Sequence, residues 1–247
     1  MTAAARPVRL MGLDYAALDV AGAAAAIARR PAGAAFRYVV TPNADHLVRL
    51  ARQPELLPLY AGAWLRLLDS RVVGGAARLF GLAAPPVCPG SDLTAALVAG
   101  LRREDRVTVI GASRETVARL GLRHAAQHIP PMGFEHDPAA FAAAVRFVLD
   151  HPARYVFFAV GSPRQEMLAW AVAHSAGATG TGLCIGASLA FLTGEAARAP
   201  GWMRAAGLEW AHRLGREPGR LARRYLIDNP PVFALLLRAR LDRARAG

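Results

Sequence analysis

The sequence predicts an α/β protein with a mostly parallel sheet, helices packed on that sheet and a helical C-terminal appendage. Short apolar runs typical of buried strands recur through the first three quarters of the chain, and longer alanine- and leucine-rich stretches with helical spacing separate them. After about residue 195 the strand-like runs stop. With 247 residues, 54% of them hydrophobic, the chain can bury a sizeable core.

The predicted strands and helices alternate along the chain. The short apolar runs that we interpret as strands are residues 36–40, 65–68, 107–110, 155–160 and 183–185. The segments with helical spacing are residues 44–60, 92–101, 114–128, 138–149 and 165–175. Helices of this length between strands act as crossover connections, so neighbouring strands run parallel.

Several predicted strands run directly into polar or glycine-containing turns. These turns are Thr41-Pro42-Asn43, Asp69-Ser70, Gly111-Ala112-Ser113 and Gly161-Ser162-Pro163. In open α/β sheets the ligand crevice lies at the carboxyl ends of the strands, where these turns gather. We therefore expect a substrate site built from them.

The last fifth of the chain is strongly basic. The whole chain has a net charge of +12, and from Arg198 onward eleven arginines face only four acidic residues. Arginines alternate with Trp210, Leu214, Leu221 and Tyr225, a pattern of amphipathic helices with one basic side. A solvated charged face explains this pattern as well as binding of an anion or a membrane does. We predict two units, residues 1–195 and the appendage of residues 196–247.

Composition also bears on location and partners. The two cysteines suit a reducing compartment, and no apolar run is as long as a membrane-spanning helix. We therefore expect a cytoplasmic protein that touches a membrane without crossing it. Nucleic acid would also attract this charge, but we find no recognised binding motif, and apolar residues among the arginines suit a bilayer surface better.

Two turn motifs carry candidate binding residues. Thr41 and Asn43 could hydrogen-bond a polar substrate, although Asn43 alone reads more simply as a helix N-cap. Gln165 could bind a sugar hydroxyl, and the nearby Arg164 or free backbone N–H groups could receive a phosphate. Taken alone, Asp69 is interpreted more simply as a turn or cap residue at the end of a strand.

Signals for metals and cofactors are weak. The glycines of residues 177–182 have the wrong order for a dinucleotide fingerprint, and no Walker motif or Asp-x-Asp occurs. His124 and His128 could share a helix face but have no partner ligands at suitable spacing. We expect neither a metal nor a cofactor.

The motifs in their order resemble the WecG/TagA/CpsF glycosyltransferase family, glycosyltransferase family 26. The matching segments lie between about residues 10 and 235: Thr41-Pro42-Asn43, Gly90-Ser91-Asp92-Leu93, Gly161-Ser162-Pro163-Arg164-Gln165-Glu166, Phe191-Leu192-Thr193-Gly194, Arg198-Ala199-Pro200, Gly207-Leu208-Glu209-Trp210, Arg224-Tyr225-Leu226 and Asn229-Pro230. The resemblance implies a Rossmann-like catalytic domain with helices on both faces of the sheet, and a membrane-associating appendage.

The resemblance also implies the chemistry. It implies inverting, metal-independent transfer of a sugar from a UDP-sugar to a lipid-linked saccharide, at the inner face of the cell membrane, in cell-surface polysaccharide synthesis. The implied base is Asp69, and the implied pocket residues are Thr41, Asn43 and Gln165. The implied diphosphate-binding arginines are Arg213, Arg220 and Arg223. Which sugar and acceptor are used, and whether homo-oligomers form, stay open.

The sequence departs from the family pattern beside the implied base. Members commonly have Asp-Gly-x-Gly, whereas this chain has Asp69-Ser70-Arg71-Val72. We expect a stiffer and more basic loop here, with Arg71 contacting the donor or the acceptor. The same departure motivates an alternative, a catalytically altered member with a scaffolding role.

Overall fold

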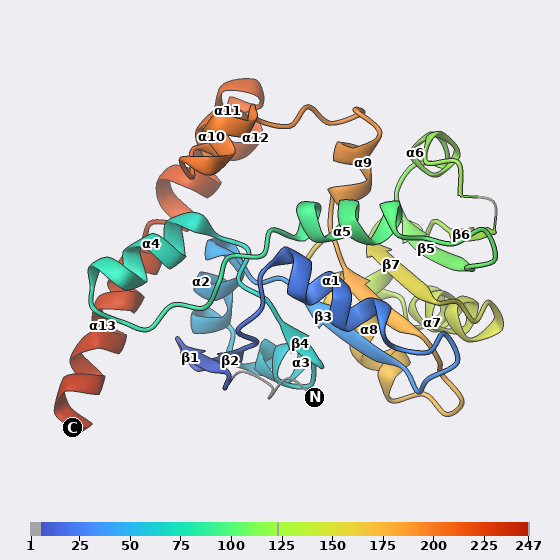
Figure 1. Ribbon diagram of the computed structural model, residues 1–247, viewed down its shortest axis with the longest axis horizontal. Helices are drawn as coiled ribbons and strands as arrows, with labels where there is room; N and C mark the ends of the chain where they lie inside the picture. Colours follow the sequence, from blue (N-terminus) through green and yellow to red (C-terminus); the bar gives the residue numbers. More distant parts are fainter. Residues whose placement is uncertain (1–5, 123, 247) are drawn as a thin grey trace.

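A six-stranded parallel sheet forms the centre of the protein in the computed structural model, which describes residues 6–122 and 124–246 (Figure 1). The strand order across the sheet is β4 (Leu65–Arg66), β3 (Arg37–Val40), β8 (Thr181–Cys184), β7 (Tyr155–Ala159), β5 (Val107–Gly111) and β6 (Ala125–His128). Every neighbouring pair is parallel. The predicted α/β class with a parallel sheet is confirmed.

Side chains alternate between the two faces of the sheet. In β7, Val156 and Phe158 pack into one apolar cluster, whereas Tyr155 and Phe157 pack into the other. Helices α2 (Ala44–Arg52), α3 (Leu57–Ala61), α7 (Pro138–Asp150) and α8 (Arg164–Ala173) cover the first face. Helices α1 (Val20–Ala28), α5 (Gly90–Ala99) and α9 (Ser188–Leu192) cover the second. Both faces are therefore shielded from water, as a parallel sheet requires.

Two predicted helices differ from the structure. The predicted helix over residues 114–128 is wrong, because α6 (Arg114–Arg119) ends before Gly121, and β6 follows as an edge strand. Gly121 has a φ of +63°, a left-handed conformation that ends helices and favours glycine. The predicted helix over residues 44–60 is interrupted at Pro54, because proline cannot donate the helical hydrogen bond.

Several elements were not anticipated, among them α1, α9, a two-stranded hairpin and a helix after β4. A hairpin of β1 (Val8–Leu10) and β2 (Leu13–Tyr15) precedes the sheet. Helix α4 (Arg71–Leu79) follows β4 and starts two residues after Asp69. Ser70 is its N-cap, because the Ser70 hydroxyl accepts a hydrogen bond from the Val73 N–H at 3.1 Å.

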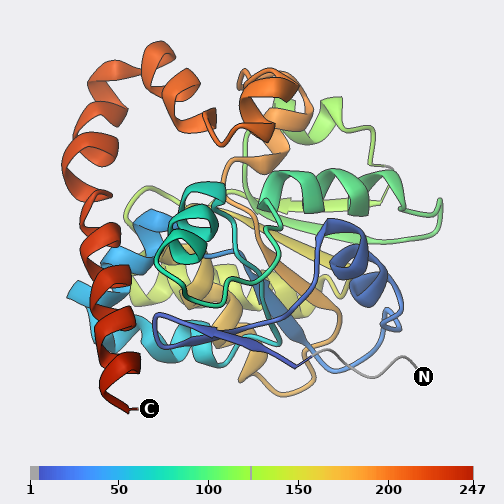
Figure 2. The same ribbon diagram turned by 60° about the vertical axis from the view of Figure 1, so that its left-hand side comes forward.

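The C-terminal residues form helices without strands, as predicted. These are α10 (Gly201–Ala205), α11 (Glu209–Arg216), α12 (Pro218–Arg223), a π-helical turn (Arg224–Asp228) and α13 (Pro231–Ala246). They form an arm along one side of the molecule, and α13 packs against α2 and α4 (Figure 2). Val232 and Leu236 anchor α13 in the apolar core. Among the described helices, none combines the length and apolar character needed to span a membrane.

Candidate active site

A cavity of about 690 Å³ lies at the carboxyl ends of the strands, under the appendage. Helix α2 leaves β3 toward one face of the sheet, and α9 leaves the neighbouring β8 toward the other. Connections that diverge in this way open a crevice at the sheet edge. Its charged lining residues are Arg49, Arg71, Arg164, Arg204, Arg213, Arg224, Asp45, Asp69 and Glu209.

Asp69 lies in the wall of this cavity, just after β4. Its backbone N–H donates to the Pro42 carbonyl at 2.9 Å, which ties the end of β4 to the turn after β3. Burial raises the pKa of the Asp69 carboxyl from 3.8 to about 7, and a hydrogen bond from the Gly90 N–H partly opposes this rise. Gly90 begins α5, where free N–H groups favour a carboxylate. The carboxyl is thus able to exchange a proton near neutral pH.

Gly90 sets the spacing between Thr41 and Asp69. A Cβ atom placed on Gly90 would lie 2.8 Å from the Thr41 hydroxyl oxygen and 3.3 Å from the Asp69 Oδ2. The Thr41 hydroxyl therefore approaches the start of α5 more closely than a Cβ would permit, and the Asp69 carboxyl lies at a distance that a Cβ would make tight. The structure brings Thr41, Asn43, Asp69, Arg71, Gln165 and Arg213 to the same cavity.

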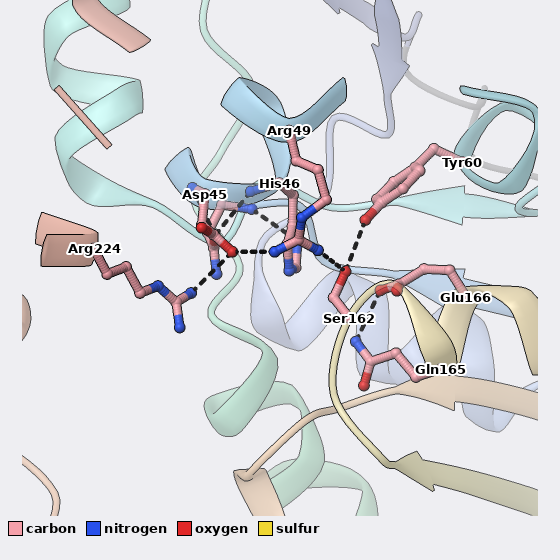
Figure 3. A network of polar contacts seen from close by, with 9 residues as sticks. Asp45, His46, Arg49, Tyr60, Ser162, Gln165, Glu166 and Arg224 are labelled. Carbon is pink, nitrogen blue, oxygen red and sulfur yellow. Dashed lines mark hydrogen bonds and ion pairs between the residues drawn. The ribbon is translucent and has the colours of Figure 1, made fainter. Parts of the chain in front are cut away.

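A polar network at the start of α2 forms one wall (Figure 3). The Asn43 Oδ1 accepts hydrogen bonds from the N–H groups of Asp45 and His46, so Asn43 is the N-cap of α2. Its Nδ2 group has no hydrogen-bond partner among the described residues. The Asn43 side chain can therefore cap the helix and still donate to a ligand.

Arg49 links this wall to the turn after β7 (Figure 3). Its guanidinium donates to the Asp45 carboxylate at 2.6 Å and to the Ser162 hydroxyl at 2.8 Å. The Tyr60 hydroxyl lies 3.2 Å from the same Ser162 oxygen. This network fixes the loops after β3 and β7 relative to each other.

Gln165 is held by the protein itself. Its Nε2 donates to Glu166 at 2.8 Å (Figure 3), and its Oε1 accepts from the Gly186 N–H at 2.9 Å. Its side chain is almost fully buried. Burial also raises the pKa of Glu166 above its ordinary value. The Gln165 amide therefore positions the turn after β8, which also lines the cavity.

The appendage is fastened to both sides of the cavity. On one side Asp92 of α5 accepts hydrogen bonds from Arg198 at 2.7 Å and Arg204 at 3.3 Å. On the other, Arg224 lies 3.4 Å from the Asp45 carboxylate. These ion pairs hold α11 and the π-helical turn over the opening.

Two of the three predicted diphosphate-binding arginines are placed by the structure. Arg213 lines the cavity, with its guanidinium 5.5 Å from the centre of the Phe191 ring. Arg223 is not among the lining residues, and its side chain is 83% exposed beside Asp228. The side chain of Arg220 lies outside the described part of the structure. Of the predicted set, only Arg213 is seen to face the cavity.

The cavity includes basic residues that the sequence reasoning did not assign, namely Arg49, Arg204 and Arg224. Arg224 belongs to the Arg224-Tyr225-Leu226 segment of the family resemblance, but the resemblance implies its neighbour Arg223. Adjacent residues point about 100° apart around a helix, and here Arg224 lines the cavity while Arg223 is exposed. Arg49 lies four residues after Asp45, a spacing that places both side chains on one helix face.

Neither histidine predicted to share a helix face is placed on a helix. His128 lies on strand β6 and stacks on Phe147, while His124 precedes the strand. The described residues contain no group of three His, Cys, Asp or Glu side chains able to hold a metal ion. The cationic groups that face the cavity are guanidinium groups of arginine.

Comparison with protein families agrees with this arrangement. The family model described as glycosyl transferase WecG/TagA/CpsF family matches residues 8–246. The match includes both the sheet that carries Asp69 and the appendage that carries Arg213 and Arg224.

Proposed function

This chain belongs to the WecG/TagA/CpsF family of glycosyl transferases, and we propose that it moves a sugar from a UDP-sugar to a saccharide carried on a polyprenyl diphosphate. Membership of the family implies a glycosyl transferase of cell-surface polysaccharide synthesis. The proposal adds the donor, the acceptor and an inverting mechanism without a metal. The observation that carries it is Asp69, a carboxyl with a pKa of about 7 in a cavity whose cations are arginines.

Asp69 is the proposed general base. The acceptor hydroxyl attacks the anomeric carbon of the donor sugar, and the Asp69 carboxylate takes the hydroxyl proton. The bond between the anomeric carbon and the diphosphate oxygen breaks on the opposite face, so the configuration inverts. A base with a pKa near the working pH combines a useful deprotonated fraction with the strength to accept the proton.

Arg213 and Arg224 are the proposed partners of the departing UDP. Negative charge builds up on the diphosphate as the bond breaks, and fixed guanidinium groups stabilise it more than mobile water does. The Arg224 Nε has no hydrogen-bond partner among the described residues, although it is buried. Binding of a diphosphate would satisfy this group. The predicted roles of Arg220 and Arg223 stay predictions, and the exposure of Arg223 suits a surface contact better.

Polar groups after β3 are the proposed contacts to the donor. Thr41 and Asn43 line that side of the cavity, and among the described residues neither the Thr41 hydroxyl nor the Asn43 Nδ2 has a hydrogen-bond partner. We assign Gln165 a positioning role instead of a direct contact, because both ends of its amide are engaged within the protein. Arg71, two residues after Asp69, is assigned to the acceptor.

The appendage is the proposed contact with the inner face of the cell membrane. It carries exposed apolar side chains beside its arginines: Trp202, Leu226, Ile227, Phe233, Leu237 and Leu241. Apolar side chains insert at the lipid boundary, while arginines attract anionic headgroups. Docking there would bring the cavity to an acceptor that is itself embedded in the membrane.

A transfer assay tests the proposal. UDP-glucose, UDP-N-acetylmannosamine and its uronic acid form are each combined with short-chain lipid-diphosphate saccharides, with and without EDTA. We expect product from one donor, formed equally well in EDTA. Donor and acceptor that both bind without any product would favour the scaffolding role instead. Product that disappears in EDTA would contradict the metal-free mechanism.

A further inference from the structure

A second, smaller cavity of about 270 Å³ adjoins the main one between α4 and the end of α10. It shares with the main cavity the residues Arg71, Val72, Val87 and Gly207. Its own additional lining consists of Arg78, Ala205 and Ala206. One substrate molecule could therefore occupy both cavities, with one part in the smaller cavity and another part at Asp69.

One face of α4 builds the basic side of this cavity. Positions 71, 74 and 78 lie on the same side of a helix, one above the other. A Cβ on Gly74 would lie only 3.7 Å from the Arg78 Nη2, so this guanidinium folds back over the glycine. Gly207 closes the other side, because a Cβ there would lie 3.5 Å from the Arg71 Cβ.

The two guanidinium groups share the cavity without a counter-charge. Among the described residues, neither Arg71 nor Arg78 has a carboxylate within ion-pair distance, and no acidic residue lines this cavity. Phosphate esters match the arginine fork especially well, so an anion of this class would pair both guanidinium groups.

We propose that Arg71 and Arg78 bind the diphosphate of the lipid-linked acceptor. This inference rests on the proposed function. The acceptor hydroxyl must meet the base, and Arg71 is two residues from Asp69 in sequence. Arg78 lies about 10 Å farther along the helix axis, toward Leu79, whose side chain is 83% exposed. The order Asp69, then Arg71 and Arg78, then Leu79 thus matches the order of hydroxyl, diphosphate and lipid in the acceptor.

The donor is a poorer occupant of this cavity. Arg213 and Arg224, which face the main cavity, do not line the smaller one. Arg213 and Arg224 are therefore available for the diphosphate of the departing UDP. Arg71 and Arg78 are available for the diphosphate of the acceptor, which stays bound to its lipid. Two separate sets let the enzyme hold both substrates at once, as a direct displacement demands.

Binding and kinetics of Arg78→Gln test this assignment, with Arg103→Gln as control. Arg103 is exposed and lies before the amino end of β5, whereas the cavities lie at the carboxyl ends of the strands. Farnesyl diphosphate binding is measured by calorimetry. We expect Arg78→Gln to weaken it about tenfold, the loss of a charged hydrogen bond, and Arg103→Gln to leave it unchanged.

The kinetic arm identifies the substrate concerned. Arg78→Gln should raise the KM for the lipid-diphosphate saccharide about tenfold, while the KM for the UDP-sugar and for a neutral alkyl glycoside acceptor stay unchanged. An increased KM for the UDP-sugar would place the donor here and overturn the assignment. Weaker binding to phosphatidylglycerol vesicles with unchanged farnesyl diphosphate binding would overturn it too, in favour of a lipid headgroup.

The two arms separate this inference from the proposed function. If the parent protein binds farnesyl diphosphate through Arg78 but transfers no sugar, the cavity assignment stands and the proposed transfer fails. If the parent protein transfers sugar and Arg78→Gln binds farnesyl diphosphate and acceptor as the parent does, the cavity assignment fails alone.

Discussion

Replacement of Asp69 by asparagine should stabilise the protein while it removes activity. The pKa of this carboxyl is raised from 3.8 to about 7 in the folded chain. One pKa unit corresponds to about 1.4 kcal/mol, so a charged Asp69 would cost up to about 4 kcal/mol. Asp69 retains some contact with water, which lowers this cost to about half. We therefore expect Asp69→Asn to raise the free energy of unfolding by about 2 kcal/mol. Asparagine has nearly the same shape and can still accept from the Gly90 N–H.

The sign of the pH dependence follows from linkage. A carboxyl whose folded pKa lies above its unfolded value contributes stability at low pH, and this contribution is lost as pH rises through about 7. The advantage of Asp69→Asn should therefore be largest at about pH 8 and should shrink toward about pH 4.

Thermal unfolding of the parent and Asp69→Asn at both pH values measures this difference. For a chain of this size, about 2 kcal/mol corresponds to about 4 to 8 °C in Tm. A variant that is no more stable than the parent at the higher pH would refute the raised pKa. An advantage that is equal at both pH values would refute charge burial as its cause.

Three further predictions follow from the same geometry. The kcat/KM for transfer should rise with pH through an apparent pKa near 7, as Asp69 loses its proton; a profile flat from about pH 5 to 9 would count against this base. Gly90→Ala should lower kcat at least tenfold by displacing Thr41 and Asp69. Gly75→Ala is the control and should keep the parent kcat, because a Cβ there meets nothing within 4 Å. Equal kcat values for the two variants would contradict the close approach of Thr41 and Asp69 to Gly90. Replacement of the exposed Leu226 and Ile227 by serine should weaken binding to anionic vesicles, measured by sedimentation, at least about tenfold. The same loss on replacing the exposed Met132 by serine would refute a specific contact between the appendage and the membrane.

The parallel sheet could be predicted because its strands are short, apolar and separated by helical segments. The position of the cavity could be predicted from polar residues at strand ends, such as Asp69 after Leu68. The division of residues 114–128 into α6 and β6 could not be predicted, because the helical spacing of this segment favoured one continuous helix. Only pairing with β5 makes residues 125–128 a strand.

The roles of individual polar residues depended on tertiary contacts. Gln165 stands at the start of a helix in a motif, but the sequence does not reveal that Glu166 and Gly186 occupy its amide. The sequence likewise does not reveal which of the neighbouring residues Arg223 and Arg224 pairs with Asp45, because that depends on how the helix is rotated about its axis. That Arg71 and Arg78 line a cavity could not be predicted either, because Gly207 of the appendage, which lies beside α4, is far from both in the sequence.

The most direct test of the central assignment is the anomeric configuration and rate of sugar transfer by the parent and by Asp69→Asn, measured by NMR in EDTA. We expect the parent to give product with inverted configuration, and Asp69→Asn to be slower by about a hundredfold or more while it still binds UDP. Retained configuration, or a parent rate in the variant, would contradict Asp69 as the base of a direct displacement.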